Sequence, residues 1–244
     1  MKVYSERGLD SYSLSSLQQG MLAHSLASTG CGVDVEQVVC ELHEEIAPAQ
    51  FQNAWGAVIA RHPVLRTSFH WETEDEPHQV VHATADVEMP FRYDEFDGEQ
   101  KARRGLEDYL TSDRAAGFDP AVAPLLRVAL IRGGVGRYWF VTTFHHLVLD
   151  GRAMVTVFRE ALDIHDALVA GEPLGLKAPT EFRDYIAWLE TLDLVAAEKF
   201  WREQLKGFSA PTVLPLARTS PGEAQANGIR GELAMRFDPE VVDR

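Results

Sequence analysis

A nearly all-apolar run, Tyr138 to His145, limits the folds open to this chain more than any other segment. Apolar residues on both faces of a strand indicate that the strand is covered on both sides. Beyond this run the apolar spacing becomes that of a helix, from Met154 to Leu168. The glycines from Gly133 to Gly136 are typical of a turn, and a preceding strand is predicted from Leu125 to Arg132. The chain is therefore expected to form an α/β structure around a buried sheet.

Further elements are predicted on both sides of this strand pair. Ser15 and Gln18 fit a capping box, in which Ser15 caps the first helix and Gln18 reaches back to it. Alternating or apolar runs predict three more strands, at Val33 to Ile46, Val64 to Trp71 and Gln79 to His82. Helical spacing predicts four more helices, starting at Pro48, lying around Leu106 and Leu110, capped by Thr180, and running from Val195 to Leu205.

Charge, cysteine content and the distribution of apolar residues argue against several kinds of partner and site. The chain has 23 basic and 37 acidic residues and a formal net charge of −14, which disfavours binding to nucleic acid or to an anionic membrane. Cys31 and Cys40 are too few for a disulfide framework or a zinc site. The first residues lack the apolar stretch of a signal peptide, and no apolar run is long enough to span a membrane. A cytoplasmic location is the expectation.

The segment His145-His146-Leu147-Val148-Leu149-Asp150-Gly151 connects the buried strand to the following helix. Neighbouring residues of a strand point to opposite faces, so the two histidines are unsuited to share a metal ion, and one is expected to face a cavity. Gly151 can accommodate a sharp turn after Asp150. An imidazole beside the N–H groups and positive dipole end of a helix suits acyl transfer, in which an oxyanion is stabilised. The same residues could instead form a buried polar cluster without a catalytic role.

This heptapeptide resembles the HHxxxDG signature of the condensation domains of nonribosomal peptide synthetases, which belong to the chloramphenicol-acetyltransferase-like superfamily. Three more segments resemble other motifs of that family in the correct order: Leu14 to Leu22 (LSSLQQGML), Arg61 to Phe69 (RHPVLRTSF), and Tyr185 to Trp188 (YIAW). The resemblance spans essentially the whole chain. One departure is that Arg152-Ala153 stands where many members have Trp-Ser, so the acceptor side of the site is expected to differ locally.

The resemblance implies a role for each residue of the motif. His146 is expected to face the reaction tunnel and to act as general base or to orient the attacking amine. His145 is expected to support the turn, and Gly151 to permit the path of the backbone. Asp150 is expected to point away from the substrate and to pair with Arg66, whose guanidinium can hold a carboxylate with two hydrogen bonds. Breaking a buried pair of this kind costs about 3–5 kcal/mol.

The resemblance also implies the partners. Condensation domains join two substrates that are tethered as thioesters to the phosphopantetheine arms of carrier domains. We therefore expect donor and acceptor peptidyl carrier domains as partners, and no cofactor or metal bound by the chain itself. In this family two lobes form a V around the substrate tunnel. Residues 1–244 are expected to be the amino-terminal lobe, a two-layer α/β sandwich with a mixed sheet and flanking helices like one chloramphenicol acetyltransferase lobe.

The second lobe is expected to be absent. The family's later motifs do not occur, and Asp238-Pro239-Glu240 starts a helix that only four residues follow, so we expect truncation near the lobe junction. The chain alone is then expected to be weakly active or inactive. Three alternatives stay open: a stand-alone acyltransferase that uses coenzyme A thioesters, a non-catalytic module that docks carrier domains, and one half of a natural two-piece enzyme.

Overall fold

The computed structural model describes residues 10–27, 34–72 and 76–210. The chain divides into two compact units, Met1–Leu192 and Asp193–Arg244. In the second unit the described residues include helix α6 (Leu194–Gln204), which is capped by the Asp193 carboxylate. The helix start expected at Asp238-Pro239 lies outside the described residues.

The described residues of the first unit form two sheets. A three-stranded antiparallel sheet has the order β1-β4-β3, formed by β1 (Asp10–Ser13), β4 (His78–Val81) and β3 (Thr67–His70). A four-stranded sheet has the order β2-β7-β6-β5, formed by β2 (Val35–Leu42), β7 (Tyr138–His145), β6 (Leu126–Arg132) and β5 (Phe91–Glu95). In this sheet β5 and β6 are parallel and the other pairs are antiparallel, so the expected mixed sheet is confirmed.

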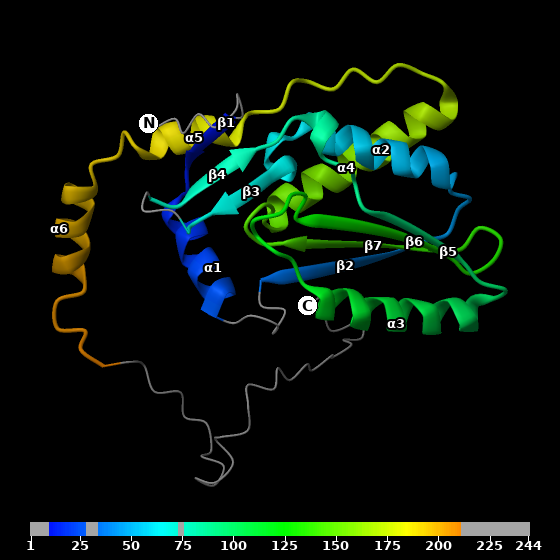
Figure 1. Cartoon of the computed structure of the whole chain (residues 1–244), viewed down its shortest axis with the longest axis horizontal. Coiled ribbons are helices and arrows are strands. Elements are labelled where there is room, and N and C mark those ends of the chain that lie inside the picture. The colour runs from blue at the N-terminus through cyan, green and yellow to red at the C-terminus, as the bar shows by residue number, and fades with distance from the viewer. Residues whose placement is uncertain (1–9, 28–33, 73–75, 211–244) are drawn as a thin grey trace, which may run out of the picture. The chain divides into compact units, whose positions relative to one another are not determined.

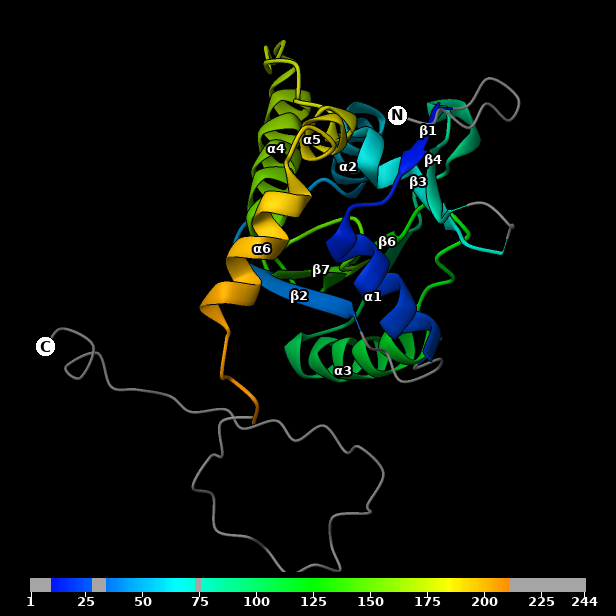
Figure 2. The same cartoon turned by 90° about the vertical axis from the view of Figure 1, so that its left-hand side faces the viewer.

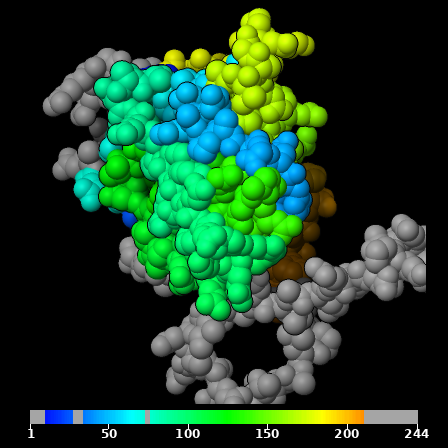
Figure 3. Space-filling view, turned by 90° about the vertical axis from the view of Figure 1, so that its right-hand side faces the viewer, coloured from blue at the N-terminus to red at the C-terminus, as the bar shows by residue number. Residues whose placement is uncertain are grey.

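Helices cover both faces of the four-stranded sheet (Figure 1). The helices of the first unit are α1 (Ser16–Ala27), α2 (Pro48–Arg61), α3 (Glu99–Ala116), α4 (Gly151–Ala170) and α5 (Phe182–Leu189). Figure 1 shows α2 and α4 on one face of the sheet and α3 on the other, and Figure 3 shows α2 and α4 lying side by side on the surface. No helix within the described residues is long and apolar enough to cross a membrane.

The alternation of residues along β7 explains this arrangement. Phe140 and Phe144 pack into a core with α2 and α4, whereas Trp139 and Val141 pack into a second core with α3. All residues of β7 are buried. The apolar run is therefore covered on both sides, as the sequence predicted, and its last residue, His145, is buried as well.

Several boundaries differ from the sequence predictions. Strands β1 and β5 were not predicted, because their sequences DSYS and FRYDE are mostly polar. Helix α3 is longer than the short helix expected, since its polar outer face hides the pattern, and it ends at Gly117, whose φ is 58°. The expected cap at Thr180 is wrong: α5 has Glu181 at its N-cap, without a side-chain hydrogen bond.

Candidate active site

The HHxxxDG segment lies where β7 ends and α4 begins. His145 is the last residue of β7 and pairs with Val35 in β2, and Asp150 is the N-cap of α4. The Val148 N–H donates to the His145 carbonyl over 3.1 Å, which closes a turn between the two elements. His146 is half-buried, whereas His145 is 1% exposed. The two histidines therefore occupy different environments, as expected for neighbours at a strand end.

His145 holds the turn from inside. The Leu147 N–H donates to His145 Nδ1 over 3.1 Å, and His145 Nε2 lies 3.1 Å from Ser25 Oγ on α1. Because an N–H can only donate, Nδ1 is the acceptor, so the neutral ring carries its proton on Nε2 and donates to Ser25. Burial lowers the pKa of His145, and the neighbouring His146 adds to this effect against an opposing contribution from Asp34.

This environment predicts acid-sensitive stability. Burial lowers the pKa of His145 and also that of His82. Between the ordinary histidine pKa of about 6.5 and the lower folded value, the unfolded chain binds more protons, so stability rises with pH. We expect urea unfolding free energies to fall as the pH is lowered from about 7.5 to about 5, and to fall less in His145→Gln. The control is His43→Gln, which replaces an exposed imidazole. If the pH dependence in His145→Gln equals that of the native chain, His145 is not the buried neutral histidine assigned here.

His146 is oriented by two carbonyl groups. Its backbone N–H donates to the Asp34 carbonyl over 2.8 Å, and its ring Nδ1 lies 2.7 Å from the Leu149 carbonyl. A carbonyl can only accept, so Nδ1 carries a proton and the neutral ring leaves its lone pair on Nε2. Within the described residues Nε2 has no hydrogen-bond partner. Nε2 is therefore the ring nitrogen of His146 that is left to accept a hydrogen bond.

The residue that supports His146 was not found from the sequence. Asp34 has a φ of 61°, in the left-handed region that few residues other than glycine adopt. Its carboxylate lies 3.3 Å from His24 Nδ1 on α1, while its carbonyl receives the His146 N–H. An aspartate tolerates this conformation better than most side chains, and no pattern around Asp34 predicts a contact with a loop so distant in sequence.

Asp150 does not have the partner expected for it. Its carboxylate accepts hydrogen bonds from the N–H groups of Arg152 and Ala153, at 3.0 and 2.7 Å, and the side chain is exposed. The first N–H groups of a helix lack partners inside the helix, and an N-cap aspartate satisfies them at short range. These two N–H groups are thus occupied, so the expectation that the start of α4 offers them to an oxyanion is wrong.

Arg66 binds carbonyl oxygens instead of Asp150. Its Nε donates to the Ile59 carbonyl over 3.1 Å and an Nη to the Ala60 carbonyl over 3.5 Å, both in the last turn of α2. The other Nη donates to the carbonyl of His82, the residue after β4. The final carbonyls of a helix lack partners within the helix and favour a cation. Arg66 therefore ties α2 to the three-stranded sheet, and the expected Arg66–Asp150 pair is wrong.

Gly151 is not required by the backbone. It is the first residue of α4, its φ lies outside the left-handed region, and a Cβ placed there would meet, beyond its chain neighbours and its own helix backbone, no described atom within 4 Å. The expectation that Gly151 permits the path of the backbone is therefore wrong, because the turn is completed before this residue by the contacts of His145 and His146.

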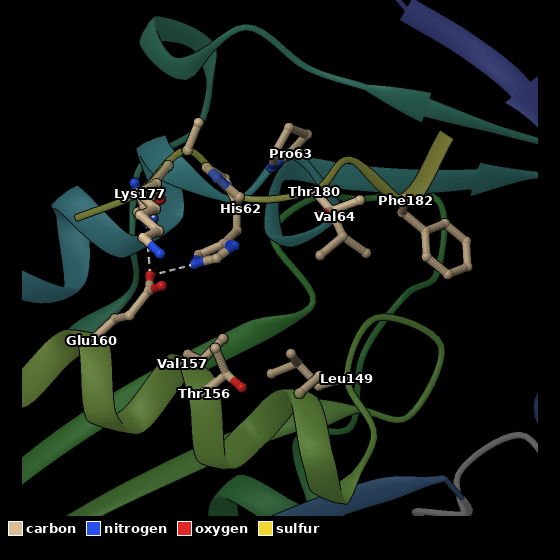
Figure 4. A pocket seen from close by; sticks show the side chains of 14 residues that line it. His62, Pro63, Val64, Leu149, Thr156, Val157, Glu160, Lys177, Thr180 and Phe182 are labelled. Atoms are coloured by element: carbon tan, nitrogen blue, oxygen red, sulfur yellow. Dashed lines mark hydrogen bonds and ion pairs between the residues drawn. The ribbon is translucent and has the colours of Figure 1, made fainter. Parts of the chain in front are cut away.

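A cavity of about 390 Å³ adjoins the motif loop, between the end of α2, α4 and residues 177–182 (Figure 4). Leu149 forms part of its wall. Glu160 on α4 accepts hydrogen bonds from Arg61 Nε at 2.9 Å and from His62 Nε2 at 2.7 Å. Burial opposes ionisation, but these partners hold the pKa of Glu160 below its usual value. Arg61, His62 and Glu160 are therefore paired with one another in the cavity wall. The sequence alone assigns no role to Arg61 or His62.

The fold and the loop together define a mixed α/β structure in which an HHxxxDG segment joins a buried strand to a helix. A family model described as "Condensation domain" matches residues 9–243. The chain belongs to the condensation-domain family.

Similar proteins include two synthases and a solved condensation domain. A linear gramicidin synthase polypeptide from Brevibacillus parabrevis is 39% identical over 217 residues, which are 88% of this chain and 4% of that protein. Bacitracin synthase 3 from Bacillus licheniformis is 35% identical over 233 residues, which are 96% of this chain and 4% of that protein. The starter condensation domain of the rhizomide synthetase has a TM-score of 0.74 at 17% identity, covering 82% of this chain and 49% of that structure. The chain thus spans about half of that solved condensation domain and a few per cent of these synthases.

Proposed function

We propose that this chain is the amino-terminal lobe of a condensation domain that forms peptide bonds between two carrier-tethered substrates. The acceptor α-amine attacks the carbonyl carbon of the donor thioester, the C–S bond breaks, and the donor acyl group moves to the amine. The thiol of the donor phosphopantetheine arm leaves, and the amine loses one proton. The match to the condensation-domain family and the likeness to peptide synthetases support this proposal.

The orientation of His146 carries the assignment of the site. Its Nδ1–H donates to the Leu149 carbonyl, so Nε2 is the nitrogen that we assign to the substrate. A free α-amine has a pKa of about 7.7–8.0, and a substantial fraction is therefore neutral near pH 7. Hydrogen bonding from the amine to Nε2 would orient it and take up its developing positive charge. We favour this positioning role over full general-base catalysis, which a weaker nucleophile would need more.

The other motif residues have supporting roles in this proposal. His145 fixes the turn through Leu147, Asp150 caps α4, and Arg66 fixes the end of α2. The partners are a donor carrier domain, an acceptor carrier domain and a second lobe that completes the tunnel. The share of this chain in the solved domain, about half, supports the need for that lobe.

The deciding experiment combines this chain with a loaded donor carrier and a loaded acceptor carrier, and intact-protein mass spectrometry reads the mass of the acceptor. We expect condensation product when the second lobe of a related condensation domain is supplied, and at most about 1% of that rate without it, because one tunnel wall cannot hold both substrates in reacting geometry. Robust turnover by the chain alone would contradict the lobe assignment. Carrier binding without product in any mixture would support a docking module.

A coenzyme A thioester is the second donor to test. A double mutant of the starter condensation domain of the rhizomide synthetase, 16% identical to this chain with a TM-score of 0.76, was solved in complex with C8-CoA and Leu-SNAC. Octanoyl-CoA offered in place of the donor carrier therefore separates two proposals. Product from octanoyl-CoA in preference to the loaded carrier would favour a coenzyme A-dependent acyltransferase, and the reverse preference supports condensation between carriers.

A further inference from the structure

The peptide groups on either side of Leu147, the residue after His146, are held by side chains. The Leu147 N–H donates to His145 Nδ1 over 3.1 Å, and the Leu147 carbonyl accepts from Gln18 Nε2 over 3.2 Å. Gln18 lies in the first turn of α1 and is 5% exposed. In Figure 2 α1 runs from the three-stranded sheet toward α3 and passes beside β2 and β7 of the four-stranded sheet. Helix α1 therefore contacts the motif loop directly.

The orientation of the Gln18 amide is fixed by its partners. Its Oε1 accepts from the Ser15 N–H at 3.0 Å, as the capping box predicts, and from Gln79 Nε2 at 3.2 Å. Its Nε2 donates to Leu147 and lies 3.4 Å from Gln79 Oε1. An N–H can only donate and a carbonyl can only accept, so a flipped amide would break the contacts to Ser15 and Leu147 together. Gln18 Oε1, which caps α1, and Gln18 Nε2, which binds the Leu147 carbonyl, therefore belong to one planar amide of fixed orientation.

A second contact from α1 reaches the same turn. Ser25, further along the helix, lies 3.1 Å from His145 Nε2 and holds the ring that receives the Leu147 N–H. The ring of His146 in turn depends on the Leu149 carbonyl, which follows in the same loop. The contacts from α1 thereby fix the loop immediately after His146. A shift of this loop would move the ring nitrogen that we assign to the substrate amine.

We infer that Gln18 is a positioning residue for His146, which couples the cap of α1 to the active-site loop through the Leu147 carbonyl. The inference rests on the function proposed above for its effect on rate, but its effect on the His146 ring does not depend on that function. It predicts that the donor group of Gln18, and not its capping oxygen, holds the loop in the position where the Leu149 carbonyl sets the tautomer of the His146 ring, and thereby affects the rate of condensation.

Gln18→Glu separates these two roles. Glutamate is the other residue that completes a capping box, so a carboxylate still accepts the Ser15 N–H and the Gln79 amide. It removes the donor to Leu147 and places a negative charge beside that carbonyl. Gln19→Glu is the matched control: it makes the same chemical change at the next position of α1, where the side chain is exposed. Both variants carry the same net charge.

We expect Gln18→Glu to lower kcat about 10- to 100-fold at a pH of about 8.5, with KM within about twofold, because small displacements of a catalytic group cost factors of this size. The assay uses this chain, the supplied second lobe and both loaded carriers. The loss should shrink as the pH is lowered, because burial raises the pKa of the introduced carboxyl and the protonated form can again donate to Leu147. Equal kcat values in Gln18→Glu and Gln19→Glu at every pH would overturn the inference.

Nitrogen NMR of ¹⁵N-histidine-labelled chain gives the readout that is independent of turnover. In the native chain and in Gln19→Glu we expect the neutral His146 ring to show the proton on Nδ1, and in Gln18→Glu a mixture of both tautomers. Unchanged His146 signals in Gln18→Glu would reject the inference even if the rate fell. Absence of condensation in the native mixture, with altered His146 signals in Gln18→Glu, would reject the proposed function and retain the inference.

Ser25→Ala provides a second route if Gln18→Glu does not fold. This change removes the partner of His145 Nε2 from a partly buried site on the same helix and leaves the capping box intact. We expect a smaller loss, about 3- to 10-fold in kcat, and a broadened or shifted His146 signal. Native His146 signals and native kcat in a folded Ser25→Ala chain would show that α1 does not position the loop.

Discussion

Replacing His146 with alanine is expected to lower kcat for condensation by about 10²–10⁴-fold in the presence of the second lobe, with a smaller change in KM. The ring Nδ1 is already bonded to the Leu149 carbonyl, so the variant loses the one oriented nitrogen that the loop offers to the amine. His146 is half-buried and its backbone contact to Asp34 is retained, so the unfolding free energy should change by less than about 1 kcal/mol. Single-turnover transfer between loaded carriers measures the rate, and urea unfolding measures the stability.

The control for this variant is His43→Ala, which removes an exposed imidazole and should leave the rate unchanged. His146→Gln distinguishes the two possible roles of the ring. A glutamine oxygen can accept a hydrogen bond from the amine but cannot take its proton near neutral pH, so substantial residual activity in this variant supports positioning. Activity as low as that of His146→Ala supports a general base. Native activity in His146→Ala would refute the catalytic assignment.

The strand and the capping box could be predicted because each depends on neighbours in sequence. The apolar residues from Tyr138 to His145 require cover on both faces wherever the strand lies, and the structure supplies α2, α4 and α3 for that purpose. Ser15 and Gln18 are three residues apart and bond reciprocally, as the pattern predicts. Strand β5 lies at the edge of the sheet and has a mostly polar sequence, so its pairing with β6 leaves no clear period in the sequence.

The contacts that orient the site could not be predicted because they join distant segments. Gln18 and Leu147 are separated by 129 positions, and Ser25 and His145 by 120. The capping role of Gln18 is visible in sequence, but a side-chain amide has two further donors whose partners only the fold determines. The resemblance to condensation domains implied that Asp150 pairs with Arg66. Each side chain instead binds backbone groups at the end of a helix: Asp150 accepts from N–H groups at the start of α4, and Arg66 donates to carbonyls at the end of α2. These nearby backbone groups compete with an ion pair between the two side chains.

Because Arg66 and Asp150 have separate partners, replacing each is expected to lower the unfolding free energy independently, and the loss at Arg66 is expected to be the larger. Arg66→Met is expected to lower the unfolding free energy by about 2–4 kcal/mol, because the buried guanidinium donates to the carbonyls of Ile59 and Ala60, and to that of His82, which are left without this donor. Asp150→Ala is expected to cost only about 1 kcal/mol, the usual effect of removing an N-cap side chain. Methionine fills much of the arginine volume, so the larger loss reports the hydrogen bonds and not a cavity.

A double-mutant cycle then decides between the two arrangements of these residues. With separate partners, the effects of Arg66→Met and Asp150→Ala should add within about 0.5 kcal/mol in urea unfolding. A buried ion pair would instead make Asp150→Ala cost about 3–5 kcal/mol, and the double variant would then lose far less than the sum. Asp150→Asn is the matched test of the cap, since asparagine caps about as well as aspartate and should retain most of the stability. A coupling energy above about 1.5 kcal/mol, together with a large loss in Asp150→Asn, would show that the two side chains meet in solution and that the separate arrangement is wrong.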